Sequence, residues 1–283
     1  MQKKILDYRY LFVVLIAVVV IGGMAWANTI FTRHSTLEKD FLVPWLGART
    51  LLQYGVDPFS ELAAQRAQIV YYGRLAEEGE DPLGLSIAMP VELFYIPFAM
   101  IDDYYLAMGL WMTLAELALV ATGFLCFHLI NWKPSTITRS VLLIGLLLWV
   151  YSFRLFIQAS LGPWVFLGIV GVLVAIKNHR DDLAGALMAL VLLAPALSLP
   201  FIIFIIFWTM QTKRWRLWWG FFVVVASTIL FSFLIFPSWV LPFLRNVIAS
   251  MAFMNNVTVG GLLTEWWPSI GKRLACPWPA APA

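Results

Sequence analysis

The sequence has little charge. Only 12% of its 283 residues are Asp, Glu, Lys or Arg, whereas 61% are hydrophobic. An ordinary soluble domain has about 25% charged and about 45–50% apolar residues. A chain of this composition could not cover its surface with ionised groups, which excludes a soluble enzyme and a disordered chain. The small net charge of +3 gives no support to a nucleic-acid partner. A lipid bilayer is therefore the expected surrounding.

Cysteines and nucleotide or hydrolase motifs are also scarce. Cys126 and Cys276 are far apart and lack metal-like spacing, so neither a zinc site nor a disulfide framework is expected. No G-x-x-x-x-G-K-[ST], G-x-S-x-G or H-E-x-x-H motif is present, which leaves P-loop, serine-hydrolase and zincin chemistry without support. We predict no metal and no cofactor.

Long apolar runs are what the chain does contain. A membrane-spanning helix needs about 20 mainly apolar residues. Residues 11–32 carry no charge. This run exceeds the roughly 7–15 residues of a signal-peptide core, so we interpret it as a retained first span. Further apolar stretches cover residues 85–101, 104–132, 141–153, 155–176, 183–210 and 217–240.

Basic residues predict the topology. They flank three joints between apolar stretches: Lys133, Arg139, Lys177, Arg180, Lys213, Arg214 and Arg216. The positive-inside rule places all three joints in the cytoplasm. After the first span leaves the cytoplasm, a single inward crossing must return the chain to Lys133. Only one of the stretches 85–101 and 104–132 can therefore span the membrane. Residues 85–101 contain Pro90, Glu92 and Pro97, so we expect them to form a re-entrant or interfacial segment. The same parity requires two short helices within residues 183–210, separated by an outer turn near residues 197–200, because Pro195 and Pro200 interrupt helical hydrogen bonding.

The expected fold is an all-α polytopic membrane protein with about seven spans. Residues 1–32 form a cytoplasmic N-terminus and first span, 33–103 an extracytoplasmic loop, 104–240 a six-helix region and 241–283 an extracytoplasmic tail. In the loop, an apolar stripe predicts a helix with Asp40 at its N-cap and Gly55 as its stop. Ser60 is expected to cap a second helix that runs to about Glu78. Both helices are expected to lie on the membrane surface.

Several short motifs together resemble a known family. They are an outer Asp40-Phe41, a helix with Ala48, Arg49, Leu51 and Leu52, a turn with Gly55, Asp57, Pro58 and Phe59, and a proline-aromatic segment from Pro90 to Pro97. Gln158 and the stretch from Ser198 to Trp215 extend the similarity. The chain thereby resembles the integral-membrane glycosyltransferases of family 87, over most of residues 8–240. This family has the GT-C architecture, and its known members are polyprenyl-phosphate-mannose-dependent mannosyltransferases of the bacterial envelope.

The chain also departs from the family pattern. Leu199-Pro200 stands where the family often has Lys-Pro, and Met89-Pro90 where Tyr-Pro-Pro is common. Family members are longer and have more spans beyond the point at which this chain stops. The stretch 271–283 shows no helical or strand period. A frayed end, a truncation and a frameshifted tail are the three interpretations of this stretch, and an inactive truncated homologue stays an open alternative.

The resemblance implies an inverting sugar transfer at the outer face of a bacterial plasma membrane. The basic residues before the first span and the positive-inside rule place the N-terminus in the cytoplasm. The implied donor is a polyprenyl-phosphate sugar, with mannose the expected sugar, and the acceptor is a lipid or a glycan. The reaction needs a general base, for which Asp40 is the candidate, and cations or hydrogen-bond donors near the phosphate. The alternative role of Asp40 is a helix N-cap.

The candidate substrate-binding residues are weighed against simpler roles. Arg154 at an outer boundary, with Gln158 one helical turn further on, fits phosphate binding, but Arg154 could equally snorkel to lipid headgroups. Asp57 is a second candidate carboxylate, but Asp-Pro is also typical of a turn. His34 could contact the donor phosphate or the acceptor, or be a solvated loop residue. Arg49 is a weaker candidate for binding the phosphate. Glu116, an acid inside a span, favours either a direct role or internal hydrogen bonding. A membrane transporter or lipid flippase is the competing function.

Overall fold

The computed structural model describes residues 8–251, and within this range it contains thirteen helices and no strand. The helices are α1 (Tyr8–His34), α2 (Lys39–Tyr54), α3 (Glu61–Tyr72), α4 (Met89–Glu92), α5 (Ile96–Ala99), α6 (Tyr104–Leu129), α7 (Thr136–Leu148), α8 (Val150–Ile157), α9 (Gly162–Lys177), α10 (Asp181–Val191), α11 (Pro195–Thr212), α12 (Trp215–Ile235) and α13 (Val240–Met251).

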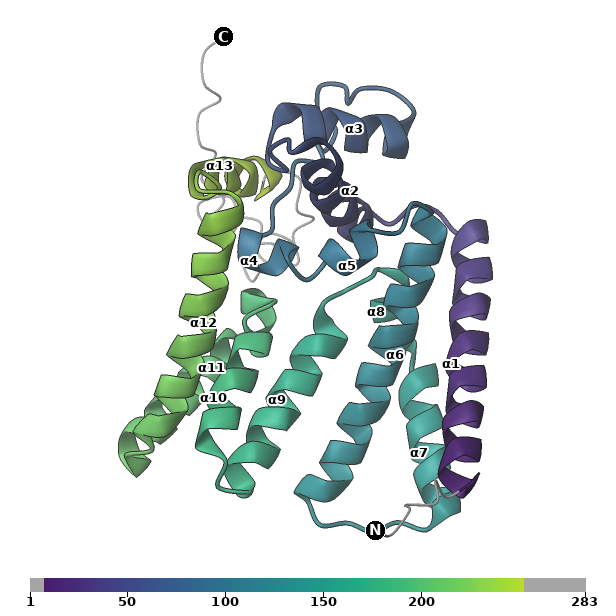
Figure 1. Ribbon diagram of the computed structural model, residues 1–283, viewed down its shortest axis with the longest axis vertical. Coiled ribbons are helices and arrows are strands. Elements are labelled where there is room, and N and C mark those ends of the chain that lie inside the picture. The colour runs from purple at the N-terminus through teal and green to yellow at the C-terminus, as the bar shows by residue number, and fades with distance from the viewer. Residues whose placement is uncertain (1–7, 252–283) are drawn as a thin grey trace, which may run out of the picture.

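The helices form two layers. Helices α1, α6, α7 and α9–α12 run up and down in a bundle, and α2–α5 with α13 lie across one end of it (Figure 1). We call this covering layer, residues 39–101 together with α13, the platform. The start of α1 and the α6–α7, α9–α10 and α11–α12 turns lie at the opposite end. Because these turns carry the basic residues named above, we call it the basic end.

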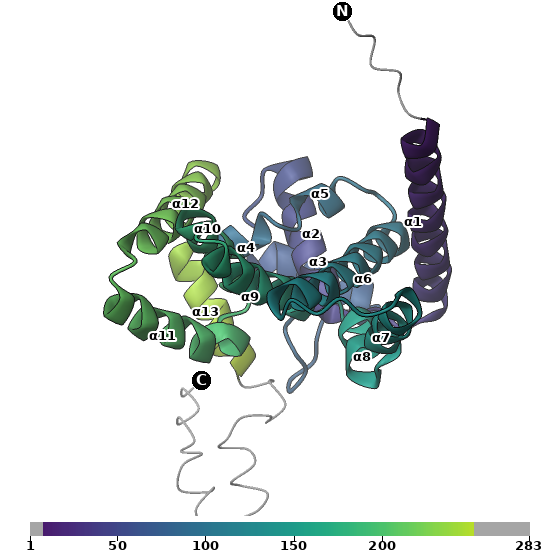
Figure 2. The same cartoon turned by 90° about the horizontal axis from the view of Figure 1, so that it is seen from below.

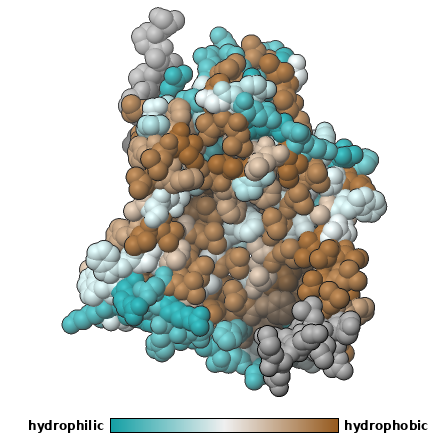
Figure 3. All heavy atoms as spheres, viewed as in Figure 1, coloured by the Kyte–Doolittle hydropathy of each residue, from teal (hydrophilic) through white to brown (hydrophobic). Residues whose placement is uncertain are grey.

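The surface pattern of the bundle suits a membrane. In the described part of the chain, three helices are long and apolar enough to cross one, at Leu11–His34, Tyr104–Leu129 and Trp215–Ile235. The pair Thr136–Leu148 and Val150–Ile157, bent by 52°, would make a fourth. Hydrophobic residues dominate the middle of the face shown in Figure 3, and hydrophilic residues gather towards its two ends. A lipid bilayer covers such an apolar belt without the penalty that water would impose.

Adjacent bundle helices pack in a row. Helix α6 lies between α1 and α9, and α10 lies between α9 and α12. Glycine permits the closest crossing, because a Cβ built on Gly185 of α10 would lie 2.0 Å from the Leu217 carbonyl oxygen of α12. Helix α11 stands to one side of this row (Figure 2). Its sparse packing leaves an apolar groove between α11 and α12.

Several helices begin or end at residues other than those expected from the sequence. The second outer helix ends at Tyr72, not near Glu78, because Gly73 adopts the left-handed conformation (φ 74°) and its N–H bonds to the Ile69 carbonyl. The break within residues 183–210 lies at residues 192–194, before the turn expected near 197–200. Pro195 begins α11, where its missing N–H costs nothing, and Pro200 lies inside that helix.

Other elements agree with the expectation from the sequence or differ from it in part. Residues 85–101 contain only the four-residue helices α4 and α5, in agreement with the expected non-spanning segment. The stretch 155–176 is divided at residues 158–161, because α8 ends at Ile157 and α9 begins at Gly162. The first part of the expected tail, residues 241–251, belongs to α13, which begins at Val240. The part of that tail from 252 to 283 lies outside the described residues.

Side-chain contacts tie the basic end together. The Lys177 ammonium donates to the carbonyls of His128 (2.9 Å) and Leu129 (2.8 Å), the last residues of α6. Arg214 donates to Asp181 at 3.1 Å, joining the α11–α12 turn to α10. Lysine and arginine at helix C-termini satisfy free carbonyls and complement the helix dipole. These cations therefore hold neighbouring turns together as well as marking one side of the bundle.

Candidate functional site

The Asp40 carboxylate lies in the first turn of α2 but does not cap it. The N-cap is Glu38, whose carbonyl accepts hydrogen bonds from the N–H groups of Phe41 (3.2 Å) and Leu42 (2.9 Å). The N-cap expected at Asp40 is thus wrong by two residues. The side chain of Asp40 makes no hydrogen bond or ion pair to any residue between 8 and 251. An unengaged carboxylate at a helix N-terminus is favoured by the dipole and is free to act on a ligand.

The charges around Asp40 come from one cluster on the platform. Lys39 donates to Asp81 at 2.8 Å, which neutralises the nearest cation. Asp40 is accessible at the surface, yet the protein atoms around its carboxylate displace part of its hydration and raise its pKa. Lys39 opposes this increase and Asp81 adds to it. The same effect raises the pKa of Glu38, where burial acts first and Asp40 second.

An aromatic cluster holds this end of α2 in place. Phe41 is fully buried, and its ring centroid lies 5.6 Å from that of Trp111 on α6. Tyr95 stacks on Trp111 at 4.7 Å with an interplanar angle of 12°. Aromatic pairs of this kind add stability beyond the area they bury. Because Phe41 follows Asp40 directly, the cluster fixes the position of that carboxylate over the bundle.

Helix α8 lies at the platform end of the bundle (Figure 1); it contains Arg154, and Gln158 follows its last residue as the C-cap. The Gln158 N–H bonds to the Arg154 carbonyl at 3.0 Å, so the two residues lie one turn apart, as their spacing predicts. Both side chains are exposed. Phe156, between them, shares a hydrophobic core with Phe41. The fold thus anchors α8 and the start of α2 in the same core. Among the described residues, Asp40 forms no hydrogen bond or ion pair with Arg154 or Gln158.

The other predicted site residues make contacts within the fold. The exposed His34 lies at the end of α1, with Nδ1 2.8 Å from the Ile30 carbonyl oxygen. Arg49 donates to the Ile101 carbonyl at 3.0 Å and forms an ion pair with Asp102. Asp57 accepts the Phe59 N–H at 2.8 Å, which is the turn geometry expected of Asp-Pro. Burial raises the pKa of Asp57, and that hydrogen bond opposes the increase.

A polar cavity of about 760 Å³ lies beside Asp57, between α3, the loop that follows it and α13. Its lining includes Gln65 and Glu61 from α3 and Arg245 and Asn246 from α13. Asn246 donates to the carbonyls of Phe59 (3.3 Å) and Leu85 (3.1 Å), which fastens α13 to the platform. The sequence contains no local signal for this cavity, because its two walls are about 160 residues apart in the chain. Its size falls within the range of small-molecule sites, about 300–1,000 Å³.

Glu92 is a further carboxylate that sequence reasoning treated only as a reason against a span. It is fully buried on α4, and neither carboxylate oxygen has a hydrogen-bond partner among residues 8–251. A Cβ on Gly47 of α2 would lie 3.0 Å from its Oε1, so the carboxyl group presses against that helix. Burial raises its pKa well above the ordinary value.

No group of three or more His, Cys, Asp or Glu residues suited to a metal ion occurs in the searched residues 8–251. No family model, no curated protein and no solved structure matches this chain. The fold and surface of residues 8–251 define the class on their own: this part of the protein is all-helical, with three or four candidate membrane-crossing segments and a platform at one end.

Proposed function

We propose that this protein is a membrane glycosyltransferase that moves a sugar from a polyprenyl-phosphate donor to a hydroxyl of a lipid or glycan at the platform face. The observation that carries the proposal is the Asp40 carboxylate, held over the end of the bundle by Phe41 and engaged by no described side chain. The resemblance to family 87 supplies the reaction and the expected sugar, mannose.

The seven passes of the bundle and their orientation belong to the same proposal. Helices α1, α6, α7 with α8, α9, α10, α11 and α12 alternate in direction between the two ends. With the basic end in the cytoplasm of a bacterium, the platform faces outward. Helices α9 and α10 are short for a span, with 16 and 11 residues. Short helices are tolerated where protein or a water-filled cavity surrounds their ends, as the platform does here.

The chemistry assigns one role to each part of the site. The acceptor hydroxyl attacks the anomeric carbon, Asp40 takes the hydroxyl proton, and the bond from the anomeric carbon to the phosphate oxygen breaks. The polyprenyl phosphate leaves with the electron pair, and the configuration is inverted. A general base at this position contributes typically about 10²–10⁴-fold to the rate. Arg154 and Gln158 would hold the phosphate, because a guanidinium binds phosphate through paired hydrogen bonds.

The polar cavity beside Asp57 suits a hydroxyl-rich acceptor better than a phosphate. Its lining contains the carboxylates of Glu61, Glu77 and Glu80, which would repel an anion but accept hydrogen bonds from sugar hydroxyls. The adjoining residue Asp81 bonds to Lys39, next to Asp40. The loop that lines the cavity therefore reaches the proposed base.

The test is transfer of radiolabelled mannose from polyprenyl-phosphate-mannose by membranes that contain the protein. Wild type should transfer the label, and Asp40→Asn should lose it by about 10²-fold or more. Glu38→Gln is the matched control, because it removes a neighbouring carboxylate whose pKa is also raised. Equal transfer by Asp40→Asn and wild type would overturn the assignment of the base. Absence of transfer by wild type from this and other polyprenyl-phosphate hexoses would favour a transporter or an inactive homologue.

A further inference from the structure

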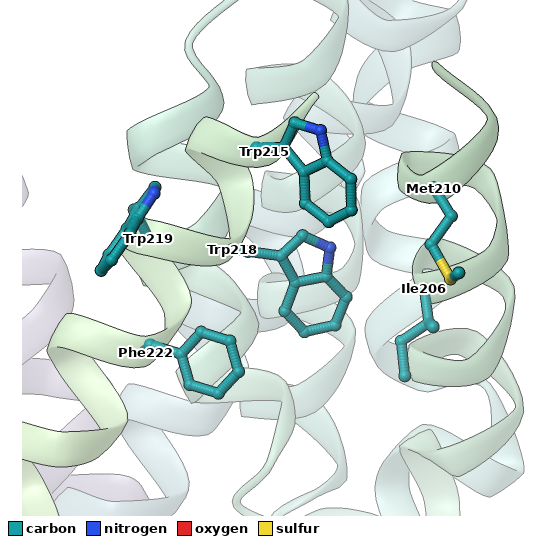
Figure 4. Close-up of a pocket in the computed structure, with 6 residues that line it drawn as sticks. All are labelled: Ile206, Met210, Trp215, Trp218, Trp219 and Phe222. Atoms are coloured by element: carbon teal, nitrogen blue, oxygen red, sulfur yellow. The ribbon is translucent and has the colours of Figure 1, made fainter. Parts of the chain in front are cut away.

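An apolar groove of about 460 Å³ lies between α11 and α12 at the basic end. Figure 4 shows Trp215 and Trp218 of α12 pointing towards Met210 and Ile206 of α11. Its lining consists of Ile206, Met210, Trp215, Trp218, Trp219 and Phe222. None of these six side chains is charged, so the groove suits a hydrocarbon ligand.

The walls of the groove are joined by one hydrogen bond and one turn. The Trp218 indole N–H donates to the Thr209 hydroxyl at 2.9 Å, and Thr209 is fully buried. The polar atom of Trp218 is therefore used between the helices, and its ring faces the groove. Lys213, with a left-handed backbone (φ 56°), lies in the turn that joins α11 to α12. Lys213 thus stands at the end of the groove where its two walls meet.

Among residues 8–251, the charges around this turn leave one cation available. Arg214 forms an ion pair with Asp181, and Arg216 donates to Asp182 at 3.3 Å. Lys213 is exposed, and its ammonium has no hydrogen bond or ion pair to any described residue. An ammonium without a partner in the described part of the chain, beside an apolar groove, is complementary to a molecule with one anionic head and a long hydrocarbon chain.

We propose that this groove binds one acyl chain of an anionic phospholipid, whose phosphate is held by Lys213. Trp215 is 56% exposed and Trp219 is 71% exposed. Tryptophan beside basic residues is typical of the interface between hydrocarbon and headgroups. The lipid belongs to the leaflet at the basic end, where basic pockets between helices bind anionic headgroups. This inference requires the bundle to lie in a membrane but does not depend on the transferase proposal.

A second copy of the chain fits the groove less well. A twofold interface would bring the same surface of each copy together, and therefore two basic ends side by side. Lys213 of each copy would then repel the other, whereas a phospholipid phosphate would attract it. A phospholipid also brings a flexible chain that can enter a narrow groove, whereas a packed helix needs about 8–10 Å between axes.

The experiment is native mass spectrometry of the full chain, purified in mild detergent and mixed with phosphatidylglycerol or phosphatidylcholine. Wild type should retain one phosphatidylglycerol more strongly than phosphatidylcholine. Lys213→Gln should lower that preference about fivefold, the factor expected for one basic side chain near an anionic headgroup. Met210→Trp, which fills the groove, should reduce retention of both lipids. Should this variant fail to fold, Trp215→Ala removes one wall and should have the same effect.

A matched control is available at the same end of the bundle. Trp132 and Lys133 also place an exposed indole beside an exposed lysine, in the α6–α7 turn. Trp132→Ala and Lys133→Gln should leave lipid retention unchanged, because neither residue lines the groove. The proposal is overturned if Lys213→Gln keeps the full preference, or if Met210→Trp and Trp215→Ala both retain phosphatidylglycerol as wild type does. A dimer lost in the filled variant would show that a second copy occupies the groove.

Discussion

The Asn28 side-chain amide of α1 donates to the Glu116 carboxylate of α6 at 3.1 Å. The same amide nitrogen lies 3.0 Å from Thr113 Oγ1. Glu116 therefore has the internal partner that was one of its two sequence-based alternatives. Polar residues inside a membrane bundle are costly unless they find such partners.

Loss of the amide should weaken the packing of α1 on α6. Asn28→Leu is expected to lower the free energy of unfolding by about 1–2 kcal/mol, because it leaves the Glu116 carboxyl without its donor. The measurement is thermal unfolding in detergent micelles. Trp26→Leu is the control, since Trp26 is 69% exposed on the same helix. Equal stability of Asn28→Leu and wild type would contradict a structural role for this pair.

Gly185 should tolerate no side chain. In Gly185→Ala the added Cβ would overlap the Leu217 carbonyl oxygen, 2.0 Å away, and force α10 from α12. We expect a loss of about 1–3 kcal/mol or more, measured by the same unfolding assay. Gly145→Ala on α7 is the matched control, because nothing lies within 4 Å of its built Cβ. There the better helix propensity of alanine should leave stability equal or higher.

Glu92 should make stability depend on pH. Its pKa is raised in the folded protein, so the unfolded chain loses this proton first as pH rises. The contribution of Glu92 is fully present below its unfolded pKa, near 4.5, and is lost as pH rises towards the folded value. Glu92→Gln should therefore unfold at a higher temperature than wild type at neutral pH, and the gain should shrink near pH 4. A constant difference across this range would contradict the burial of an unpaired carboxyl.

The rate of the proposed sugar transfer should fall at acidic pH, which gives its pH profile an acid limb. A general base acts in its ionised form, and burial raises the pKa of Asp40 above the ordinary 3.8. The transfer rate should therefore fall as pH decreases through a value above 3.8. Asp81→Asn removes an acid that raises this pKa and should move the limb to lower pH. A limb that stays in place in Asp81→Asn would indicate that another group controls the rate.

Thiol labelling can test the orientation of the two ends. Glu78 is exposed in the platform loop, and Asn178 is exposed in the α9–α10 turn. With Cys126 and Cys276 replaced by serine, Glu78→Cys should react with an impermeant reagent on intact cells. Asn178→Cys should react only after lysis. The reverse pattern would invert the topology, while labelling of both before lysis would contradict a membrane between the two ends.

Local chemistry explains which parts of the platform could be predicted. Gly55 ends α2 in the left-handed conformation (φ 62°), and the Ser60 side chain accepts the Ala63 N–H to cap α3. These features depend on residues within four positions of each other, so the pattern is sufficient. The start of α2 was mispredicted because aspartate is a preferred N-cap residue, whereas the helix begins where Phe41 can be fully buried.

In the candidate site too, local features could be predicted from the sequence and long-range contacts could not. The sequence alone places Asp40 at the start of an outer helix and Arg154 one turn before Gln158. Their common anchoring appears only in the fold, where Phe41 and Phe156 enter one core. The cavity beside Asp57 likewise needs α13, which is separated from it by most of the chain. Such contacts have no counterpart in local spacing.

The sequence by itself determined that the chain is helical, strongly apolar and basic at three joints, because hydropathy and charge are properties of single residues and their neighbours. The tertiary structure decided that Glu92 is buried without a described partner and that α11 stands apart from α12 with a groove between them. Both depend on how distant helices pack. Packing depends on side-chain shape across the whole bundle. The pattern of neighbouring residues along the chain does not predict it.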